Sequence, residues 1–182
     1  DTAVNAAVEA IDRIRDTATS HDRLFIVEVM GRDTGFIAAS VGIAGGAEEI
    51  LAPEYPVPVD KVVEKIKASL ARGKRSSIIV MAEGQKPGRA YDLAEQIRKK
   101  MNVDPKVCIL GHQQRGGSPS ATDRILATRM GAAAVQTLLE GKCGVYIGLD
   151  GLNLVTVPFE SALKNKKLAP KEYLQLASTL AL

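Results

Sequence analysis

The amino-acid sequence predicts an α/β fold with a mainly parallel sheet. Three apolar runs rich in Val and Ile occupy residues 24–30, 76–82 and 106–110, and helical patterns lie between them at residues 35–45, 59–71 and 91–101. Alternation of strand and helix is typical of parallel sheets. Strands that are apolar almost throughout indicate a sheet covered on both faces.

The first element is expected to be a helix. Residues 1–16 carry apolar side chains three or four positions apart, at Val4, Val8, Ile11 and Ile14. The sequence begins inside this pattern without an initiator Met, so we expect it to be the later part of a longer polypeptide.

Local signals predict the elements after residue 117. Ser118 is expected to cap a helix with Pro119 at its first position, and Gly141 to end it. Residues 145–158 are expected to form two strands joined by a type I′ turn at Asp150-Gly151. A short terminal helix is expected at residues 171–182.

Composition bounds the class of protein. The chain has 182 residues, of which 46% are hydrophobic and 25% charged, as in a globular protein of one or two domains. Its 24 basic and 21 acidic residues are scattered, so the formal charge of +3 indicates neither a nucleic-acid-binding surface nor a membrane-binding one. No apolar run approaches the roughly 20 residues that span a bilayer.

The two cysteines indicate a reducing compartment. Cys108 and Cys143 lie in or beside apolar runs, without a C-x-x-C spacing. Two buried, reduced thiols of a cytosolic protein are therefore preferred over a disulfide.

Several kinds of chemistry have no support in the sequence. His21 and His112 are the only histidines and have no suitably spaced ligand partner, which argues against a histidine-based metal site. There is no G-x-x-x-x-G-K-[ST] loop, so a nucleotide triphosphate would have to be bound elsewhere. No Ser-His-Asp or Cys-His arrangement can be assembled.

Polar residues follow the three predicted strands. Arg32 and Glu83 lie just after the first two, and His112 and Arg115 follow the third, each with glycine close by. Because carboxyl ends of parallel strands meet at one edge, these side chains are expected to share a cleft. Guanidinium forks suit phosphate and a carboxylate can accept hydrogen bonds from hydroxyls, so a phosphorylated sugar would fit. The alternative is that they are solvated loop residues.

Two weaker signals remain open. The basic run at residues 72–75 is either a phosphate site or a solvated helix end, and Gly45-Gly46 either binds phosphate or ends a helix. The expected helix start after Gly116-Gly117 would add backbone donors for an anion next to Arg115.

Long motifs resemble the bacterial 6-phosphofructokinases. They are V-E-V-M-G-R at residues 27–32, A-G-G-A-E at 44–48 and L-G-H-Q-Q-R-G-G-S-P at 110–119, extended by residues 10–23 and 123–131. The resemblance covers essentially the whole chain. It implies a three-layer α/β/α phosphofructokinase fold with the N-terminal half of the subunit missing.

The resemblance also implies roles for the strand-end residues. His112 and Arg115 resemble residues that hold the phosphate of fructose 6-phosphate, and Met30, Gly31 and Glu83 resemble those that position its ring. Arg32 resembles an arginine near the transferring phosphoryl group, where a fixed positive charge lowers the barrier.

Two further residues resemble groups that reach across from a neighbouring subunit. Arg23 matches the first of these arginines. The second is replaced by Lys106, a point charge in place of a bidentate fork, so the phosphate contact is expected to be weaker or differently arranged.

An effector site is implied as well. In allosteric members of this family, ADP or phosphoenolpyruvate binds between subunits of a homotetramer. The matching positions here are Arg15, Gly46, Glu48, Arg72 and Lys74, with Glu48 also a candidate ligand of an effector-linked Mg²⁺.

The implied activity is transfer of the γ-phosphoryl group of MgATP to the 1-hydroxyl of fructose 6-phosphate, in cytosolic glycolysis. The ATP loops, the general base and most Mg²⁺ ligands would precede this sequence, so the isolated chain is expected to be inactive.

The chain is expected to contain a sugar-phosphate-binding domain (residues 1–113), a returning segment of the nucleotide domain (114–162) and a C-terminal helix (163–182). Pyrophosphate as donor and a non-catalytic sugar-phosphate-binding module are the alternatives.

Overall fold

The computed structural model describes residues 1–18, 23–74, 76–164 and 168–180, with the side chains at positions 17, 18 and 23 excepted. The chain divides into two compact units, residues 2–117 with 168–182, and residues 118–167 with residue 1. The expected boundaries lay at 113/114 and 162/163, and the roles expected for these parts remain predictions.

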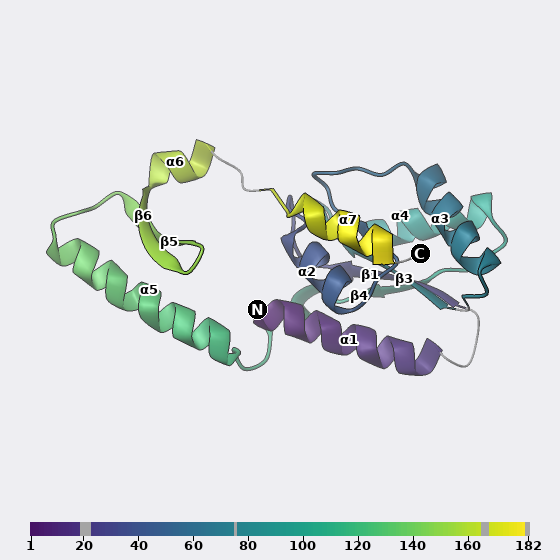
Figure 1. The fold of residues 1–182 in the computed structure, drawn as a ribbon, viewed down its shortest axis with the longest axis horizontal. Coiled ribbons are helices and arrows are strands. Elements are labelled where there is room, and N and C mark those ends of the chain that lie inside the picture. Colours follow the sequence, from purple (N-terminus) through teal and green to yellow (C-terminus); the bar gives the residue numbers. More distant parts are fainter. Residues whose placement is uncertain (19–22, 75, 165–167, 181–182) are drawn as a thin grey trace. The chain divides into compact units, whose positions relative to one another are not determined.

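The larger unit is built on a four-stranded parallel sheet (Figure 1). Its strands, in the spatial order β2-β3-β1-β4, are β2 (Glu49–Leu51), β3 (Ser76–Ala82), β1 (Arg23–Val29) and β4 (Lys106–Ile109). The three longer strands occupy the runs predicted from the sequence. The three-residue β2 was not predicted because it is too short for a periodicity signal.

Helices cover both faces of the sheet, so the three-layer α/β/α fold is confirmed (Figure 1). One core contains α1 (Thr2–Ala18), α2 (Phe36–Ala44) and α7 (Lys171–Leu180), and the other contains α3 (Val59–Ala71) and α4 (Arg89–Lys100). Strand β1 serves both because alternate side chains point to opposite faces. Val27 lies in the first core and Ile26 in the second.

The smaller unit contains one long helix, a hairpin and a short helix. These are α5 (Ala121–Leu139), β5 (Val145–Asp150), β6 (Asn153–Pro158) and α6 (Phe159–Lys164). The prediction that Ser118 caps α5 is wrong, because the cap is Ser120, whose hydroxyl accepts a hydrogen bond from the Asp123 backbone N–H at 3.2 Å. Gly141 follows the helix end with φ 74°, as expected.

The hairpin turn differs from the predicted type I′. That turn needs positive φ at both central residues. Gly151 has φ 59°, but among the described residues Arg32 is the only non-glycine with positive φ, so Leu152 has not. A glycine with positive φ at the first central position alone fits a type II′ turn.

The thiols are less buried than predicted. Both cysteines are free, but Cys143 is exposed and Cys108 only partly buried. Burial raises the pKa of the Cys108 thiol, which keeps it protonated and unreactive. Among the residues that the structure describes, no helix is long and apolar enough to cross a bilayer.

Candidate functional site

The carboxyl ends of β3, β1 and β4 lie side by side. The Glu83 N–H donates to the Val29 carbonyl at 2.9 Å, and the Leu110 N–H donates to the Glu28 carbonyl at 3.0 Å. The sheet ladder thus continues just past the strands on both sides of β1. This edge carries most of the residues expected to bind a phosphorylated sugar.

The turn after β1 brings Arg32 to Glu83. The Arg32 N–H donates to the Glu83 carboxylate at 3.3 Å, and Arg32 has φ 49°, a conformation rare for a residue with a side chain. At Gly31 a Cβ atom would lie 2.4 Å from the Thr34 carbonyl oxygen, so only glycine fits. Such backbone strain persists where the surrounding structure enforces it and clusters at functional sites.

A 3₁₀ turn, η1 (Gly111–Arg115), follows β4 and presents His112 and Arg115. Its anchor is Gln114, which is only 2% exposed. The Gln114 side chain accepts a hydrogen bond from the Met30 N–H at 2.7 Å and donates one to the Ala3 carbonyl at 3.0 Å. With Gln114 fixed, the side chains of His112 and Arg115 are left exposed to solvent.

A buried carboxylate fixes the neighbouring helix start. Glu28 is 1% exposed, and it accepts hydrogen bonds from the backbone N–H groups of Gly88 at 2.7 Å and Ala90 at 2.8 Å. A carboxylate at a helix N-terminus satisfies donors that have no partner within the helix and interacts favourably with the helix dipole. Glu28 therefore holds α4 against β1 beside the candidate site.

Neither Gln114 nor Glu28 was predicted from the sequence to have a separate role. Arg89 was not predicted either, and its guanidinium lies so close to Gly84 that a Cβ there would be 2.8 Å from its Nη1 atom. An isolated Glu within an apolar strand was the available signal for Glu28. Gln114 lies in the motif L-G-H-Q-Q-R-G-G-S-P, but no local sequence signal distinguishes it from the exposed Gln113.

Arg23 and Lys106 lie at the other end of the sheet. They begin β1 and β4, whereas Met30 and His112 follow the ends of these strands. Val29 lies six positions after Arg23 along β1, which corresponds to roughly 20 Å at a strand rise of about 3.3 Å per residue. The structure therefore does not bring these two residues to the strand-end site of the same chain.

The five candidate effector residues form one connected group. The Arg15 guanidinium donates to the carbonyls of Gly45 and Gly46, each at 2.5 Å, and Lys74 forms an ion pair with Glu48 at 2.9 Å. Gly46 and Lys74 line one small cavity, and Glu48 and Arg72 line another of about 110 Å³. Arg75, the last residue of the basic run, lies outside the described residues.

No metal centre is evident in this part of the chain. Among the described residues, no group of three or more His, Cys, Asp or Glu side chains is arranged to hold a metal ion. Both carboxylate oxygens of Glu48 already have protein partners, Lys74 and the Ile78 N–H. His21 lies outside the described residues.

The fold and the strand-end site together define the class: an α/β protein with cationic and carboxylate side chains at the carboxyl edge of a parallel sheet, as expected for an anionic ligand. The chain belongs to the phosphofructokinase family, whose family model matches residues 1–138.

Its relatives are bacterial enzymes of this family. The chain is 53% identical to ATP-dependent 6-phosphofructokinase 1 of Thermus thermophilus and 50% identical to the ATP-dependent 6-phosphofructokinase of Brevibacillus brevis. Both matches cover all 182 residues. The chain spans about 56% of the length of either relative.

Solved structures share the fold. A phosphofructokinase from Saccharomyces cerevisiae matches 89% of this chain, over 23% of its own, with a TM-score of 0.79 and 35% identity. A pyrophosphate-dependent phosphofructokinase from Marinobacter aquaeolei matches 97% of this chain, over 54% of its own, with a TM-score of 0.76 and 26% identity.

Proposed function

We propose that this chain is the sugar-phosphate-binding part of an ATP-dependent 6-phosphofructokinase, which transfers the γ-phosphoryl group of MgATP to the 1-hydroxyl of fructose 6-phosphate in glycolysis. The observation that carries this proposal is the strand-end site. It joins Arg32 to Glu83 and presents His112 and Arg115 on the adjacent strand end. The names of the bacterial relatives support ATP as the donor.

Within this site, His112 and Arg115 would hold the sugar phosphate and its neighbouring hydroxyls. Met30, Gly31 and Glu83 would position the furanose ring, and the missing side chain at Gly31 lets the backbone approach it closely. The Arg32 guanidinium would stabilise charge on the transferring phosphoryl group. Arg32 is the one proposed catalytic residue in this chain.

A complete site would need two copies of the chain. Arg23 begins β1 and Lys106 begins β4, away from the carboxyl ends that carry the strand-end site, so their contact with the same phosphate would come from a neighbouring subunit. A closed homo-oligomer offers such shared sites, and we propose a homotetramer.

We propose that ADP or phosphoenolpyruvate binds the group formed by Arg15, Gly46, Glu48, Arg72 and Lys74. The connected contacts among these residues support a common site. Mg²⁺ usually binds through one or two carboxylates together with phosphate oxygens and water. Glu48 could therefore be a ligand only together with the effector's phosphates, after giving up a present partner.

The ATP loops, the general base and the main ligands of the Mg²⁺ that accompanies ATP would lie outside this sequence. The smaller unit supports this, because its apolar side chains are exposed, among them Leu139 at 77%, Leu152 at 85% and Leu163 at 85%. Exposed apolar surface of this kind marks a surface that packs against another segment. We propose that residues 114–162 complete a nucleotide-binding domain, that residues 1–113 bind the sugar phosphate, and that the isolated chain is inactive.

We also propose a cytosolic location, which the two free thiols and the glycolytic role support. A pyrophosphate-dependent enzyme is the second candidate, because a structure of that kind shares the fold at a TM-score of 0.76.

The test is an assay of the full-length polypeptide with fructose 6-phosphate and either MgATP or pyrophosphate. Fructose 1,6-bisphosphate formed with MgATP would support the proposal. Product formed only with pyrophosphate would establish the second candidate. Binding of fructose 6-phosphate without product from either donor would leave a binding module.

A further inference from the structure

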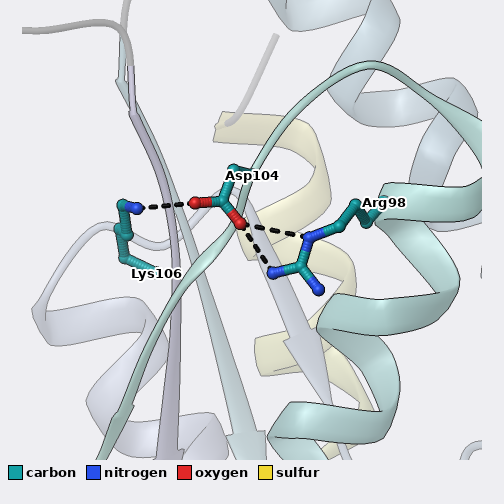
Figure 2. Close-up of polar contacts among 3 residues, drawn as sticks. All are labelled: Arg98, Asp104 and Lys106. Carbon is teal, nitrogen blue, oxygen red and sulfur yellow. Dashed lines mark hydrogen bonds and ion pairs between the residues drawn. The ribbon is translucent and has the colours of Figure 1, made fainter.

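Three charged residues meet where α4 ends and β4 begins (Figure 2). The Lys106 ammonium lies 2.6 Å from one oxygen of the Asp104 carboxylate. The Arg98 guanidinium donates to the other oxygen, at 2.6 Å from Nη2 and 3.1 Å from Nε. One carboxylate therefore holds two cations, and the cluster carries one net positive charge.

The neighbouring cations of α4 are engaged elsewhere. Lys99 pairs with Glu95 at 2.6 Å, and Lys100 pairs with Asp60 at 2.5 Å. Of the three basic residues in the last turn of α4, Arg98 is the one that shares a carboxylate with Lys106. All three side chains of the cluster remain about half exposed, so an anion can reach them from solvent.

We infer that Arg98 is a further phosphate-binding residue of this protein, which contacts the same sugar phosphate as Lys106. This inference rests on the proposed function. Lys106 offers a point charge where the family resemblance places an arginine, and the guanidinium of Arg98 supplies a planar fork that suits phosphate. Asp104 balances part of the charge of these two cations until the phosphate binds.

If Arg98 had a purely structural role, the variants would affect sugar-phosphate binding differently. Arg98 would then act only through Asp104, by orienting Lys106, and loss of Asp104 would do the same damage as loss of Arg98. If Arg98 contacts the phosphate, loss of Asp104 removes only a competing negative charge. The net charge of the cluster then rises from one to two.

The experiment measures fructose 6-phosphate saturation of the full-length protein with MgATP. Arg98→Ala is expected to raise the half-saturating concentration roughly tenfold, in line with a lost hydrogen bond to a charged group. The turnover number and the KM for ATP stay unchanged. Arg98→Lys gives an intermediate value, and the control Lys99→Ala, on the same exposed helix end, gives the wild-type value.

Asp104→Asn separates the two roles. We expect its half-saturating concentration to fall or to equal that of the wild type. An unchanged value in Arg98→Ala, or a rise in Asp104→Asn as large as that in Arg98→Ala, would overturn the inference.

Inorganic phosphate serves as a competing probe. Inhibition by phosphate is expected to weaken together with sugar-phosphate affinity in Arg98→Ala. Weakened phosphate inhibition with unchanged fructose 6-phosphate saturation would mean that Arg98 binds only a free anion, which contradicts the inference. A wild-type protein that neither binds nor turns over fructose 6-phosphate would instead refute the proposed function itself.

Discussion

Side chains at the sheet ends differ in how firmly the fold holds them. Gln114 and Glu28 are almost fully buried and hydrogen-bonded to backbone groups, whereas His112, Arg115 and Arg32 are exposed. Buried polar side chains need such partners because an unpaired one is costly. Gln114 and Glu28 therefore fix the backbone around the site. The exposed side chains of His112, Arg115 and Arg32 remain available to bind a ligand.

At the residue scale, Asp104 should titrate below a usual aspartate. The hydrogen bond from Lys106, followed by that from Arg98, lowers its pKa from the ordinary 3.8. A lowered pKa stabilises the fold only while the carboxylate is ionised, so this contribution is present above pH 3.8 and is lost as pH falls through the lowered value. The side chains are exposed, so the contribution is small.

Carboxyl carbon NMR titration checks this prediction. Lys106→Met should raise the pKa of Asp104, and Arg98→Met should raise it by less. The control is Glu140, whose pKa is lowered mainly by its hydrogen bond from Lys142 and should not change in either variant. An Asp104 pKa unaffected by both substitutions would show that the cluster does not persist in solution.

At the scale of elements, the short turn η1 depends on one side chain. Gln114 connects it both to the end of β1 and to the start of α1, through Met30 and Ala3. A 3₁₀ helix of five residues has little intrinsic stability. The position of His112 and Arg115 is therefore set by a tertiary contact.

Gln114→Ala should lower the free energy of unfolding by about 2 to 4 kcal/mol, because it removes the hydrogen bonds to the Met30 N–H and the Ala3 carbonyl and opens a cavity. Gln114→Met keeps most of the volume but cannot form both hydrogen bonds, so it should also destabilise. Urea unfolding measures both changes. Gln113→Ala, at the exposed neighbour, should stay within about 0.5 kcal/mol of the wild type. If Gln114→Met were as stable as the wild type, the lost hydrogen bonds could not be the cause of the destabilisation in Gln114→Ala.

At the scale of the whole molecule, the two ends of the sheet carry different parts of one proposed site. Arg115 follows β4, while Arg23 begins β1 at the opposite end. Neither end completes the site within one chain. The proposed function thus requires subunits to share sites.

Sharing of sites predicts rescue in hybrid oligomers. Arg115→Ala and Arg23→Ala full-length proteins should each bind fructose 6-phosphate weakly. Oligomers formed by co-expressing both should regain high-affinity sites, about a quarter of the total for random pairing across a two-fold interface. Activity at low fructose 6-phosphate measures this recovery. Mixing the purified variants without subunit exchange is the control, and hybrids no better than this control would contradict shared sites.

Much of the fold was predictable because its signals are local. The near-continuous apolar run at residues 24–30 predicted β1, the helical periodicity of residues 59–71 predicted α3, and Gly141 predicted the end of α5. The cap of α5 was predicted wrongly at Ser118, because a serine suits a helix start by its chemistry alone. The hydrogen bond from the Asp123 N–H identifies Ser120 as the cap.

The α/β class, the family resemblance and the polar residues at the strand ends could all be predicted from the sequence, because these features depend on neighbours along the chain. Tertiary structure decided the strand order β2-β3-β1-β4, the anchoring of η1 and the pairing of Arg98 with Lys106 through Asp104. Gln114 meets partners 84 and 111 positions away. No periodicity encodes such contacts, because they exist only after the sheet and its helices have packed.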